Sequence, residues 1–237
     1  MRPDGLEAMP DFVHDQLDTE RCHGDLLVQI SGESEAGCLA VVRRIARDVG
    51  SVMRLRWSAS GFAGVESRNL LGFVDGTGNP SLTNHSSAND FPFMGGSAQP
   101  WADGGSMLAV RLISFDTAAW DDTPTSSQES VIGRHKVSDT RLDESGVLRS
   151  HVGRLNADGH SPIPMLRRSY NSAIGAPEQG LIFIAYQPDF AAGFLRAQSV
   201  LAGEELARYA TTHGGGFFFT LPGLADSDDW YGRRLLT

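Results

Sequence analysis

The segment NLLGFVDGTGNPS, from Asn69 to Ser81, carries the sharpest chemical signal in the sequence. Asp75 follows an apolar run and precedes a glycine, and an ionised aspartate can accept a proton and return it to a reacting group. The glycines of the segment permit backbone conformations that are closed to other residues. An isolated Asp-Gly pair is usually a turn with a capping carboxylate. Asp75 is therefore either a turn residue or a proton-transfer group.

Three further segments contain residues that bind or stabilise charge: IGRHK at 132–136, SHVGRLN at 150–156 and MLRRSYN at 165–171. An imidazole such as that of His151 binds a metal through one ring nitrogen while the other donates to an acceptor. Arg134 and Arg167 keep their positive charge at any working pH. A lone histidine is more often a surface or satisfied buried residue, so spacing alone assigns no role.

Composition excludes several classes of protein. The 237 residues are 41% hydrophobic and 21% charged, which is ordinary for a globular chain. The net charge of −9 argues against a sequence-independent nucleic-acid binder, and no stretch approaches the roughly 20 apolar residues that cross a bilayer. The single lysine, Lys136, leaves little for Schiff-base or phosphate-loop chemistry. Cys22 and Cys38 are too few for a structural zinc cage.

The first hundred residues are expected to alternate between strands and a helix. Gly24–Gly32 is an apolar run bounded by glycines and Val52–Phe62 alternates, so both are predicted as strands. Ser34–Gly50 has apolar residues at helical spacing and predicts an amphipathic helix. From Gly64 to about Gly105 the periodicity disappears, and so long an irregular stretch inside a compact chain suggests a function.

The second half predicts the order strand, helix, strand, strand, helix, strand, which is the ferredoxin-like order. The predicted strands are Ser106–Phe115, residues 164–170, Gly180–Pro188 and Gly215–Gly223, and the predicted helices are Ser127–Arg134 and Ala191–Ala210. The first half resembles the same unit without its opening strand. We therefore expect an α+β fold with two ferredoxin-like units of the dimeric α+β barrel type. Residues 1–105 would form the incomplete first unit with the GFVDG loop, and residues 106–237 the second.

Taken together, these segments resemble the dye-decolourising peroxidases, which are haem enzymes built from two ferredoxin-like units. The matching segments are GFVDGTGNP, IGRHK, the segment around His151, LRRSY and the closing GGFFFTLPG. They stand in the order found in the family and cover nearly all of the chain from Pro10 onward. Each match is weak by itself, whereas the ordered set is specific.

The resemblance implies that His151 is the proximal ligand of haem b and that Asp75 and Arg167 lie on the distal side. There Asp75 would move the proton when the peroxide O–O bond breaks, and Arg167 would stabilise the negative charge that develops. Arg168 is the less suitable arginine of the pair. Arg134 either meets a haem propionate through a charge-assisted bond or is a surface arginine at a helix end.

The acidic partner of His151 is expected to be Glu204 or Glu205, of which Glu204 is preferred. Both glutamates could instead simply favour a helix N-terminus. His135 and His160 are expected to face solvent. The four tryptophans and four tyrosines are expected mostly in the core or at its edge, and the resemblance suggests that a few relay electrons from bulky reductants.

The implied function is a haem peroxidase that uses hydrogen peroxide to oxidise small organic reductants such as dyes and phenols. An alternative is a haem-binding protein of the deferrochelatase type, which would release iron from haem in iron acquisition without significant peroxidase turnover. A third is an inactive truncated paralogue that folds without cofactor. The partners expected are peroxide and a small reductant, with no nucleic acid and no membrane insertion, and the resemblance leaves room for a homo-oligomer.

The start of the chain departs from the family pattern. Relatives generally have further sequence before the segment LEAMPDFVHDQLD, including an export signal and a first strand, whereas nine residues precede Pro10 here. We expect the first unit to lack its opening strand and to expose a sheet edge that promotes association. The residues after Met1 form no export signal, although the resemblance suggests an exported full-length form, extracellular or periplasmic. Cys22 and Cys38 do not settle the compartment.

Overall fold

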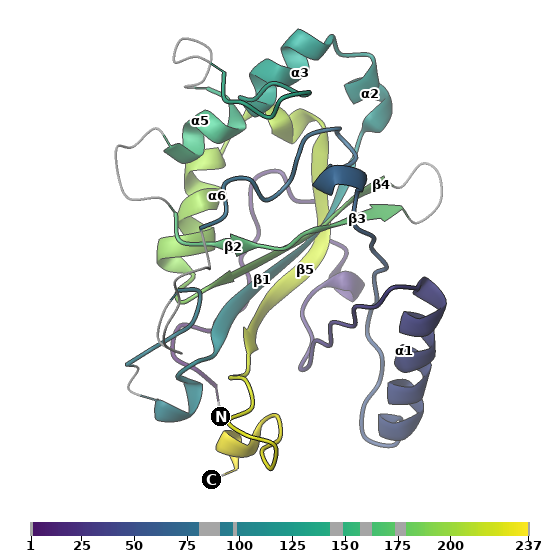
Figure 1. Cartoon of the computed structure of the whole chain (residues 1–237), viewed down its shortest axis with the longest axis vertical. Coiled ribbons are helices and arrows are strands. Elements are labelled where there is room, and N and C mark those ends of the chain that lie inside the picture. Colours follow the sequence, from purple (N-terminus) through teal and green to yellow (C-terminus); the bar gives the residue numbers. More distant parts are fainter. Residues whose placement is uncertain are drawn as a thin grey trace.

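The computed structural model of the protein describes residues 2–80, 91–96, 99–142, 149–156, 163–173 and 179–236. An antiparallel sheet forms its centre (Figure 1), with α5 and α6 beside it and α1 standing apart on the other side. None of the described helices is long and apolar enough to cross a membrane.

The strands are β1 Ser106–Phe115, β2 Leu166–Arg167, β3 Tyr170–Ala173, β4 Gln179–Gln187 and β5 Ala210–Thr220. The α-helices are α1 Glu35–Val49, α2 Thr117–Asp121, α3 Thr125–Ile132, α5 His151–Asn156 and α6 Arg196–Leu201. Short 3₁₀ helices span Thr19–Arg21, Val65–Ser67, Pro100–Ala102, Glu205–Arg208 and Arg233–Leu235, and a π-helical turn spans Ala191–Leu195.

β1 is the central strand of the sheet, whose order is β2-β4-β1-β5, with β3 also paired to β4. Met107 of β1 lies opposite Gln187 of β4 and Phe219 of β5. The chain enters the sheet at its centre, adds β2 and β3 at one edge, returns through β4 and ends at the other edge with β5. This is the ferredoxin-like arrangement, so the α+β prediction and the strands predicted at Ser106–Phe115 and Gly180–Pro188 are confirmed.

The strand predicted at 164–170 occurs as β2 and β3, which pair with β4 in one continuous register. Between them, the backbone N–H of Arg168 donates to the carbonyl of Ile184 at 2.9 Å. Because successive side chains on a strand point to opposite faces, Arg167 and Arg168 lie on different sides of the sheet. Only one of the two arginines can therefore face a given site.

Apolar layers cover both faces of the sheet, as the alternation along β1 requires. One layer contains Met107, Ala109, Ala185, Phe194 and Phe217, and the other contains Leu108, Val110, Ile184 and Phe218. A third cluster forms where α2 and α3 meet the loop after residue 64, around the fully buried Trp120. The sheet and these helices together form the rigid support of the candidate site.

Residues 15–23 run along β5 because glycines leave them room. A Cβ on Gly214 would lie 2.5 Å from the carbonyl oxygen of Arg21, so a side chain there would push the N-terminal segment away. Cys22 forms an isolated bridge with Gly215. The strand predicted at Gly215–Gly223 accordingly begins five residues earlier, at Ala210.

A buried ion pair fixes this N-terminal segment to the sheet. Arg111 and Asp15 have side chains only 6% and 5% exposed, and Arg111 Nη1 donates to Asp15 Oδ2 at 2.9 Å. Arg111 also donates to Thr212 and lies over the ring of Phe12. Losing one partner of such a pair typically costs about 3–5 kcal/mol, because the other charge stays buried and unpaired. The pair joins the two expected units, whose division at residue 105 stays a prediction.

The strands predicted at Gly24–Gly32 and Val52–Phe62 are wrong. Neither segment belongs to a ladder, and Phe62 alone forms an isolated bridge, with Asn171. A side chain instead joins the second segment to the residues that run along β5: Arg56 Nε donates to the Cys22 carbonyl at 2.8 Å. A strand needs a neighbour that satisfies its backbone groups, and an alternating sequence carries no information on whether that neighbour is present.

The two helices predicted at the ends of the chain have different outcomes. The helix predicted at Ser34–Gly50 is confirmed as α1, with the Ser34 hydroxyl accepting from the N–H of Gly37 at 3.2 Å. The continuous helix predicted at Ala191–Ala210 is wrong, since it is broken into a π-helical turn, α6 and a 3₁₀ helix. Gly203 has a φ of +70°, a left-handed conformation that ends helices. The break leaves Glu204 in a turn rather than on a helix.

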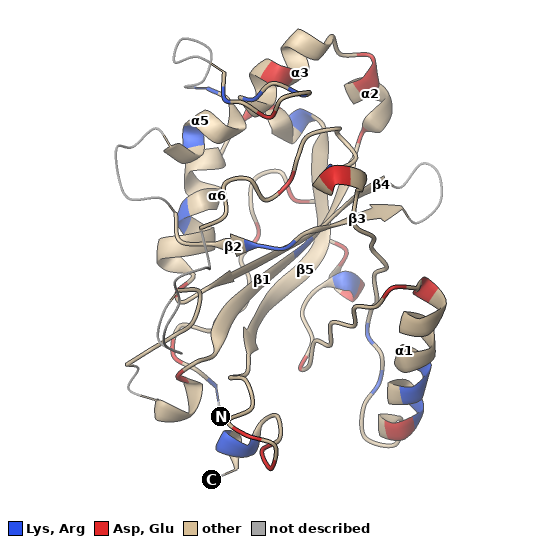
Figure 2. Ribbon diagram, viewed as in Figure 1, with Lys and Arg blue, Asp and Glu red and all other residues tan. Residues whose placement is uncertain are grey.

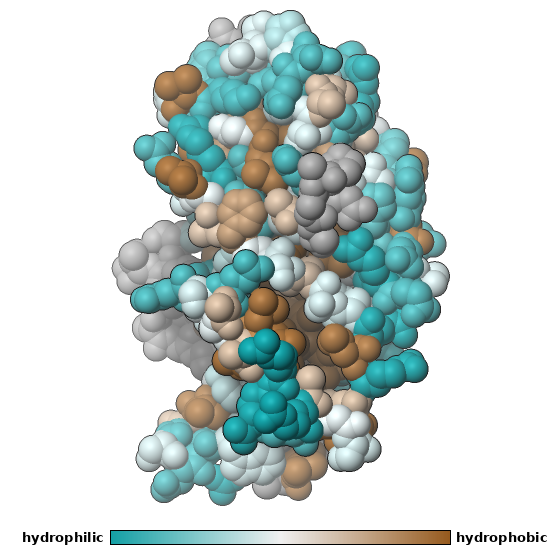
Figure 3. All heavy atoms as spheres, turned by 90° about the vertical axis from the view of Figure 1, so that its right-hand side faces the viewer, coloured by the Kyte–Doolittle hydropathy of each residue, from teal (hydrophilic) through white to brown (hydrophobic). Residues whose placement is uncertain are grey.

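Large apolar side chains around α1 are open to solvent. Leu26, Val28, Leu39, Val41, Val52, Met53 and Leu55 are between 45% and 79% exposed, and we call them the α1 apolar face. α1 itself has no buried residue. Figure 3 views the molecule from this side and shows hydrophobic atoms gathered in a hollow among hydrophilic ones. Contiguous apolar surface of this kind is typical of an interaction surface.

We expect the α1 apolar face to promote self-association as concentration rises. The double substitution Val52→Lys with Leu55→Glu should lower the mass measured by static light scattering, because it places charge on apolar surface that association would bury. Val137→Lys is the control, since Val137 is 86% exposed in the loop after α3. Equal association of all three proteins would contradict a role for this face.

Candidate active site

Two buried side chains anchor the glycine-rich loop that follows residue 64. Leu71 and Phe73 are 3% and 2% exposed, and Trp120 Nε1 donates to the carbonyl of Leu71 at 3.0 Å. Asn69 Oδ1 accepts from the N–H groups of both apolar residues, at 3.1 and 3.2 Å. The apolar part of the motif thus holds the polar part in place. The irregular stretch predicted at 64–105 is confirmed within the described residues.

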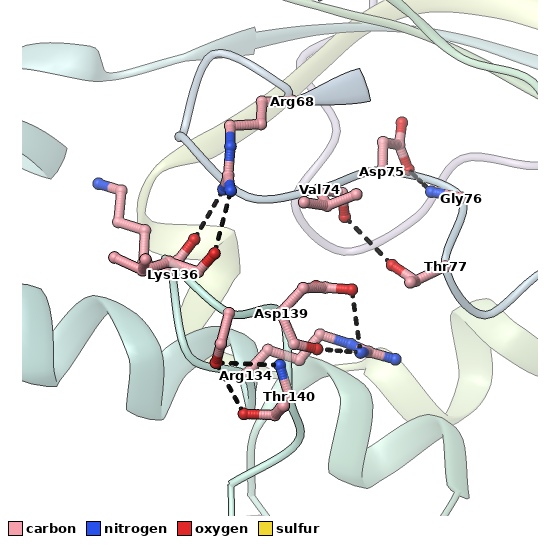
Figure 4. Close-up of polar contacts among 11 residues, drawn as sticks. Arg68, Val74, Asp75, Gly76, Thr77, Arg134, Lys136, Asp139 and Thr140 are labelled. Atoms are coloured by element: carbon pink, nitrogen blue, oxygen red, sulfur yellow. Dashed lines mark hydrogen bonds and ion pairs between the residues drawn. The ribbon is translucent and has the colours of Figure 1, made fainter. Parts of the chain in front are cut away.

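Arg68 ties this loop to the loop that follows α3 (Figure 4). Its Nη1 donates to the carbonyls of Gly72 at 2.9 Å and Lys136 at 2.7 Å, and its Nη2 donates to that of Val137 at 3.1 Å. Gly72 has a φ of +87°, and a Cβ there would lie 2.4 Å from Lys136 Cε. The side chain of Lys136 therefore packs against position 72 at a distance that only a glycine permits.

Asp75 turns the chain and leaves one carboxylate oxygen open. Its N–H donates to the carbonyl of Ser67, and its Oδ1 accepts from the N–H of Gly76, both at 2.8 Å. Gly76 has a φ of +81°, which favours glycine. No residue in the described part of the chain donates to Oδ2. Asp75 is therefore a turn residue, as its sequence context indicated, and still has an oxygen available for chemistry.

Arg167 is a partly buried cation held on β2, where Figure 2 shows basic residues at the centre of the sheet. Burial lowers the pKa of Arg167, the charge of Asp75 opposes that shift, and the charge of Arg134 adds to it. Asn79 Oδ1 accepts from the N–H and Nε of Arg167 at 3.0 and 3.3 Å. Among the described residues, none bonds its terminal nitrogens. Arg168 is exposed, so the first arginine of the pair is the one beside Asp75.

A cavity of about 280 Å³ opens between the glycine-rich loop and β2. Its lining includes Asp75, Asn79, Arg167, Arg168, Arg68 and Leu181. Arg167 brings a positive charge to this lining and Asp75 a carboxylate, whereas the side chain of Arg168 points to the other face of the sheet. The cavity is therefore suited to small polar or negatively polarised molecules that reach Arg167.

Arg134 is not a surface arginine. Its side chain is 14% exposed, and its Nη1 donates to the carbonyl of Asp139 at 2.6 Å and to Asp139 Oδ2 at 3.3 Å (Figure 4). Asp139 Oδ1 is buried without a bond to any described residue. The neighbouring His135 is 49% exposed and contacts Glu129, whereas His160 lies outside the described residues. Arg134 is thus held by Asp139 rather than by solvent, and its contact with a haem propionate stays a prediction.

His151 begins α5 and is paired with Glu204 across a 2.7 Å contact between Nδ1 and Oε2. The side chains are 27% and 12% exposed, so the pair is largely shielded from water. Arg154 fixes the turn that carries Glu204, since its Nη1 and Nη2 donate to the carbonyls of Ala202 and Gly203 at 2.8 and 3.2 Å. The preference for Glu204 over Glu205 is confirmed as a contact.

Arg134 connects the two parts of the site. It acts electrostatically on Arg167, and its neighbour Gly133 packs against Ser150, next to His151. A Cβ on Gly133 would lie 2.3 Å from Ser150 Oγ. The structure therefore brings the four predicted residues into one region, although they come from four separate segments.

The residues present fit a haem. Nδ1 of His151 is held by Glu204, which leaves Nε2 as the ring nitrogen that can ligate iron. β4 is an inner strand, yet Leu181 and Phe183 stay partly exposed, and alternation places them on the same face as Arg167. They offer apolar surface to a flat ring, while Arg134 offers a cation to its carboxylates.

Sequence reasoning missed the residues that hold the candidates in place. Asn79 lies inside the motif that the sequence singled out, and Arg68 and Arg154 lie near it or near His151, but their partners are mostly backbone carbonyls. Every residue has a backbone carbonyl, so a sequence does not show which carbonyl accepts a given hydrogen bond. The expectation for the aromatics holds in part: Trp120 is fully buried, whereas Trp230 is 50% exposed.

Comparison with known proteins gives a consistent result. The family description "Dyp-type peroxidase, C-terminal" matches residues 66–225, and "Dyp-type peroxidase, N-terminal" matches residues 1–63. Deferrochelatase of Escherichia coli (strain K12) is 36% identical over 269 aligned positions, which cover 99% of this chain and 63% of the E. coli protein. The chain thus spans slightly less than two thirds of the length of this relative.

Solved structures are similar over the whole chain. The oxyferrous complex of DtpA from Streptomyces lividans superposes with a TM-score of 0.85 at 30% identity, covering 100% of this chain and 73% of DtpA. The N246H variant of Rhodococcus jostii RHA1 DypB, in complex with heme, gives a TM-score of 0.79 at 28% identity over 94% of this chain and 74% of DypB.

Glu204 should set the tautomer of His151. With a carboxylate against Nδ1, the neutral ring carries its proton on Nδ1. Glu204→Ala removes the acceptor and should shift the proton toward Nε2, which nitrogen chemical shifts in NMR report directly. Glu205→Ala is the matched control and should leave the tautomer unchanged. An unchanged tautomer in Glu204→Ala would contradict the contact.

Proposed function

This chain belongs to the Dyp-type peroxidase family, and on that premise we propose that it binds haem b and uses hydrogen peroxide to oxidise small organic reductants such as dyes and phenols. The observation that carries the proposal is the partly buried guanidinium of Arg167, with open terminal nitrogens, next to an aspartate with an open carboxylate oxygen. A protein that only stores or carries haem has no need of this pair. The heme bound by the DypB relative supports the choice of cofactor.

His151 would hold the haem iron through Nε2, with Glu204 as the acceptor for the opposite nitrogen. That hydrogen bond orients the ring and raises its basicity as a ligand. Arg134 would meet a propionate through a charge-assisted bond, since it is buried and its partner Asp139 engages only one of its terminal nitrogens. Leu181 and Phe183 would contact the ring itself.

Asp75 and Arg167 would act on peroxide together. When bound, haem would supply the redox chemistry, namely the electrons that reduce peroxide, which the organic reductant would replace. Asp75 takes the proton from one peroxide oxygen and returns it to the oxygen that leaves as water. Arg167 keeps its charge throughout and stabilises the negative charge that develops as the O–O bond breaks. Each role requires only the open atoms described above.

A second candidate function is release of iron from haem. It is favoured by the name of the E. coli relative, Deferrochelatase, and would use the same haem-binding residues. The two functions differ in product: a peroxidase consumes peroxide and oxidises a dye, whereas a deferrochelatase yields iron and the intact metal-free porphyrin. Purified haem-loaded protein, assayed for dye oxidation and for porphyrin fluorescence, separates them. If the protein forms neither the oxidised dye nor the metal-free porphyrin, both functions are excluded.

Removing the proposed iron ligand should release the haem. In His151→Ala only apolar contacts and Arg134 would hold the group, so most haem should be lost or its absorption spectrum should change. His135→Ala is the control, because that histidine is half exposed and pairs with Glu129. Haem content is measured from the Soret absorption after gel filtration. Full occupancy with the wild-type spectrum in His151→Ala would show that another residue ligates the iron.

The variants Asp75→Asn and Arg167→Leu should keep haem but react slowly with peroxide. Loss of a positioned acid/base group typically costs about 100-fold to 10,000-fold, and loss of an electrostatic stabiliser is of about the same order, near 100-fold to 1,000-fold. Stopped-flow absorbance after peroxide addition measures the rate, with Thr77→Ala as the control from the same loop. Wild-type rates in both variants would remove the pair from the reaction.

A further inference from the structure

We propose that Asn79 is a positioning residue, which holds the guanidinium of Arg167 so that its terminal nitrogens face the space beside Asp75. The inference rests on the proposed function, because Arg167 is the group through which Asn79 would act. It concerns a residue that is not itself expected to touch haem or peroxide.

Three hydrogen bonds join the two residues, which are 88 positions apart in the sequence. Asn79 Oδ1 accepts from the backbone N–H of Arg167 at 3.0 Å and from its Nε at 3.3 Å. Asn79 Nδ2 donates to the carbonyl of Arg167 at 2.8 Å. One amide therefore fixes both the backbone and the inner edge of the guanidinium. Because the guanidinium is planar, fixing its inner edge also directs the two terminal nitrogens.

The same turn sets Asp75 and Asn79. The N–H of Asn79 donates to the carbonyl of Gly76 at 2.9 Å, and the N–H of Gly76 donates to Asp75 Oδ1 at 2.8 Å. Asp75 and the amide that holds Arg167 thus move as one unit. A shift of the loop would displace the proton-transfer group and the cation together, which keeps their relative geometry.

Gly78 leaves the space that the guanidinium occupies. A Cβ on Gly78 would lie 2.9 Å from Arg167 Nη2, so an alanine there would push the guanidinium aside. The backbone of Gly78 has no left-handed conformation, so Gly78→Ala introduces no conformational strain. It therefore tests orientation without removing a hydrogen bond.

A neutral amide suits this position better than a carboxylate. Arg167 is partly buried, and its charge is partly balanced by Asp75 alone among the groups that affect its pKa. An aspartate at position 79 would accept the same hydrogen bonds, but it would lose the one that Nδ2 donates to the Arg167 carbonyl and would also neutralise the cation. The amide orients Arg167 and leaves its charge for the developing anion.

A double-mutant cycle tests the role. Asn79→Ala should slow the peroxide-dependent change in the haem spectrum by about 10-fold to 100-fold, the usual effect of losing a group that orients a functional residue. In the Arg167→Leu background the same substitution should have no further effect, because its only route of action is gone. Gly78→Ala should behave in the same way, and Thr77→Ala should match the wild type. A further loss of rate in the Arg167→Leu background would mean a general structural role and would overturn the proposal.

Nitrogen NMR on the full chain without haem tests the hold separately. The Nε–H signal of Arg167, identified by its absence in Arg167→Leu, should exchange slowly with water in the wild type and quickly in Asn79→Ala. Asn79→Asp should keep the slow exchange, because it keeps the acceptor for Nε. It should nevertheless react slowly with peroxide, like Asn79→Ala, because its carboxylate neutralises the charge of Arg167. Unchanged exchange in Asn79→Ala would overturn the proposal.

The two assays distinguish the failure of this inference from the failure of the proposed function. If Asn79→Ala abolishes the slow Nε–H exchange but does not change the rate of reaction with peroxide, the positioning role is overturned and the peroxidase proposal stays intact. A wild-type protein that takes up haem but does not react with peroxide would overturn the peroxidase proposal, and the positioning role with it, even where NMR shows that Asn79 holds Arg167.

Discussion

The charge of Arg167 is the constraint on which the candidate site depends. A cation removed from water must find compensation, and an isolated buried charge is too costly for a fold to tolerate. Here Asp75 supplies the opposite charge and Asn79 supplies the acceptors. Both come from one short turn, so the shielding of Arg167 from water depends on the glycine-rich loop docking against β2. The position of the loop therefore depends on Arg167 of the strand, and the environment of Arg167 depends on the loop.

Docking of that loop is in turn a matter of apolar burial and backbone satisfaction. Leu71 and Phe73 bury their side chains against Trp120, while Arg68 and Asn171 bond the backbone groups that an irregular loop would otherwise leave unpaired. An irregular segment has no ladder of its own, so it depends on such side chains for the bonds that helices and strands supply internally. The polar residues of the motif are held in fixed positions because the apolar residues before them are buried.

Sequence reasoning identified the site better than its supports. Asp75, Arg134, His151 and Arg167 were predicted because they stand in segments whose order resembles a known family, and the pair Glu204 and Glu205 was singled out on the same ground. The strands of the second half were found because their apolar runs pair with one another within the chain, as β1 and β4 do. Asn79 and Arg154 escaped assignment because their partners are mostly backbone atoms, which are the same for every residue type. The break at Gly203 escaped because the apolar spacing of residues 191–210 continues across it.

The strands wrongly predicted at 24–32 and 52–62 show a second limit of sequence-based prediction, which is that it does not reveal whether a strand has a partner. Residues 24–32 form an apolar run bounded by glycines and residues 52–62 alternate, but within the described residues neither segment has a ladder partner. Several of their apolar side chains, those of Leu26, Val28, Val52 and Leu55 among them, stay exposed around α1. The site does not share this weakness. Among the described residues, no hydrogen bond or ion pair of Asp75, Arg134, His151 or Arg167 comes from residues 24–61. The support of the site instead comes from the loop after residue 64, the second-unit sheet and the segment that the Asp15–Arg111 pair binds to it. The geometry of the site is therefore set without the α1 apolar face, and whatever covers that face would act on solubility and association before it acts on chemistry.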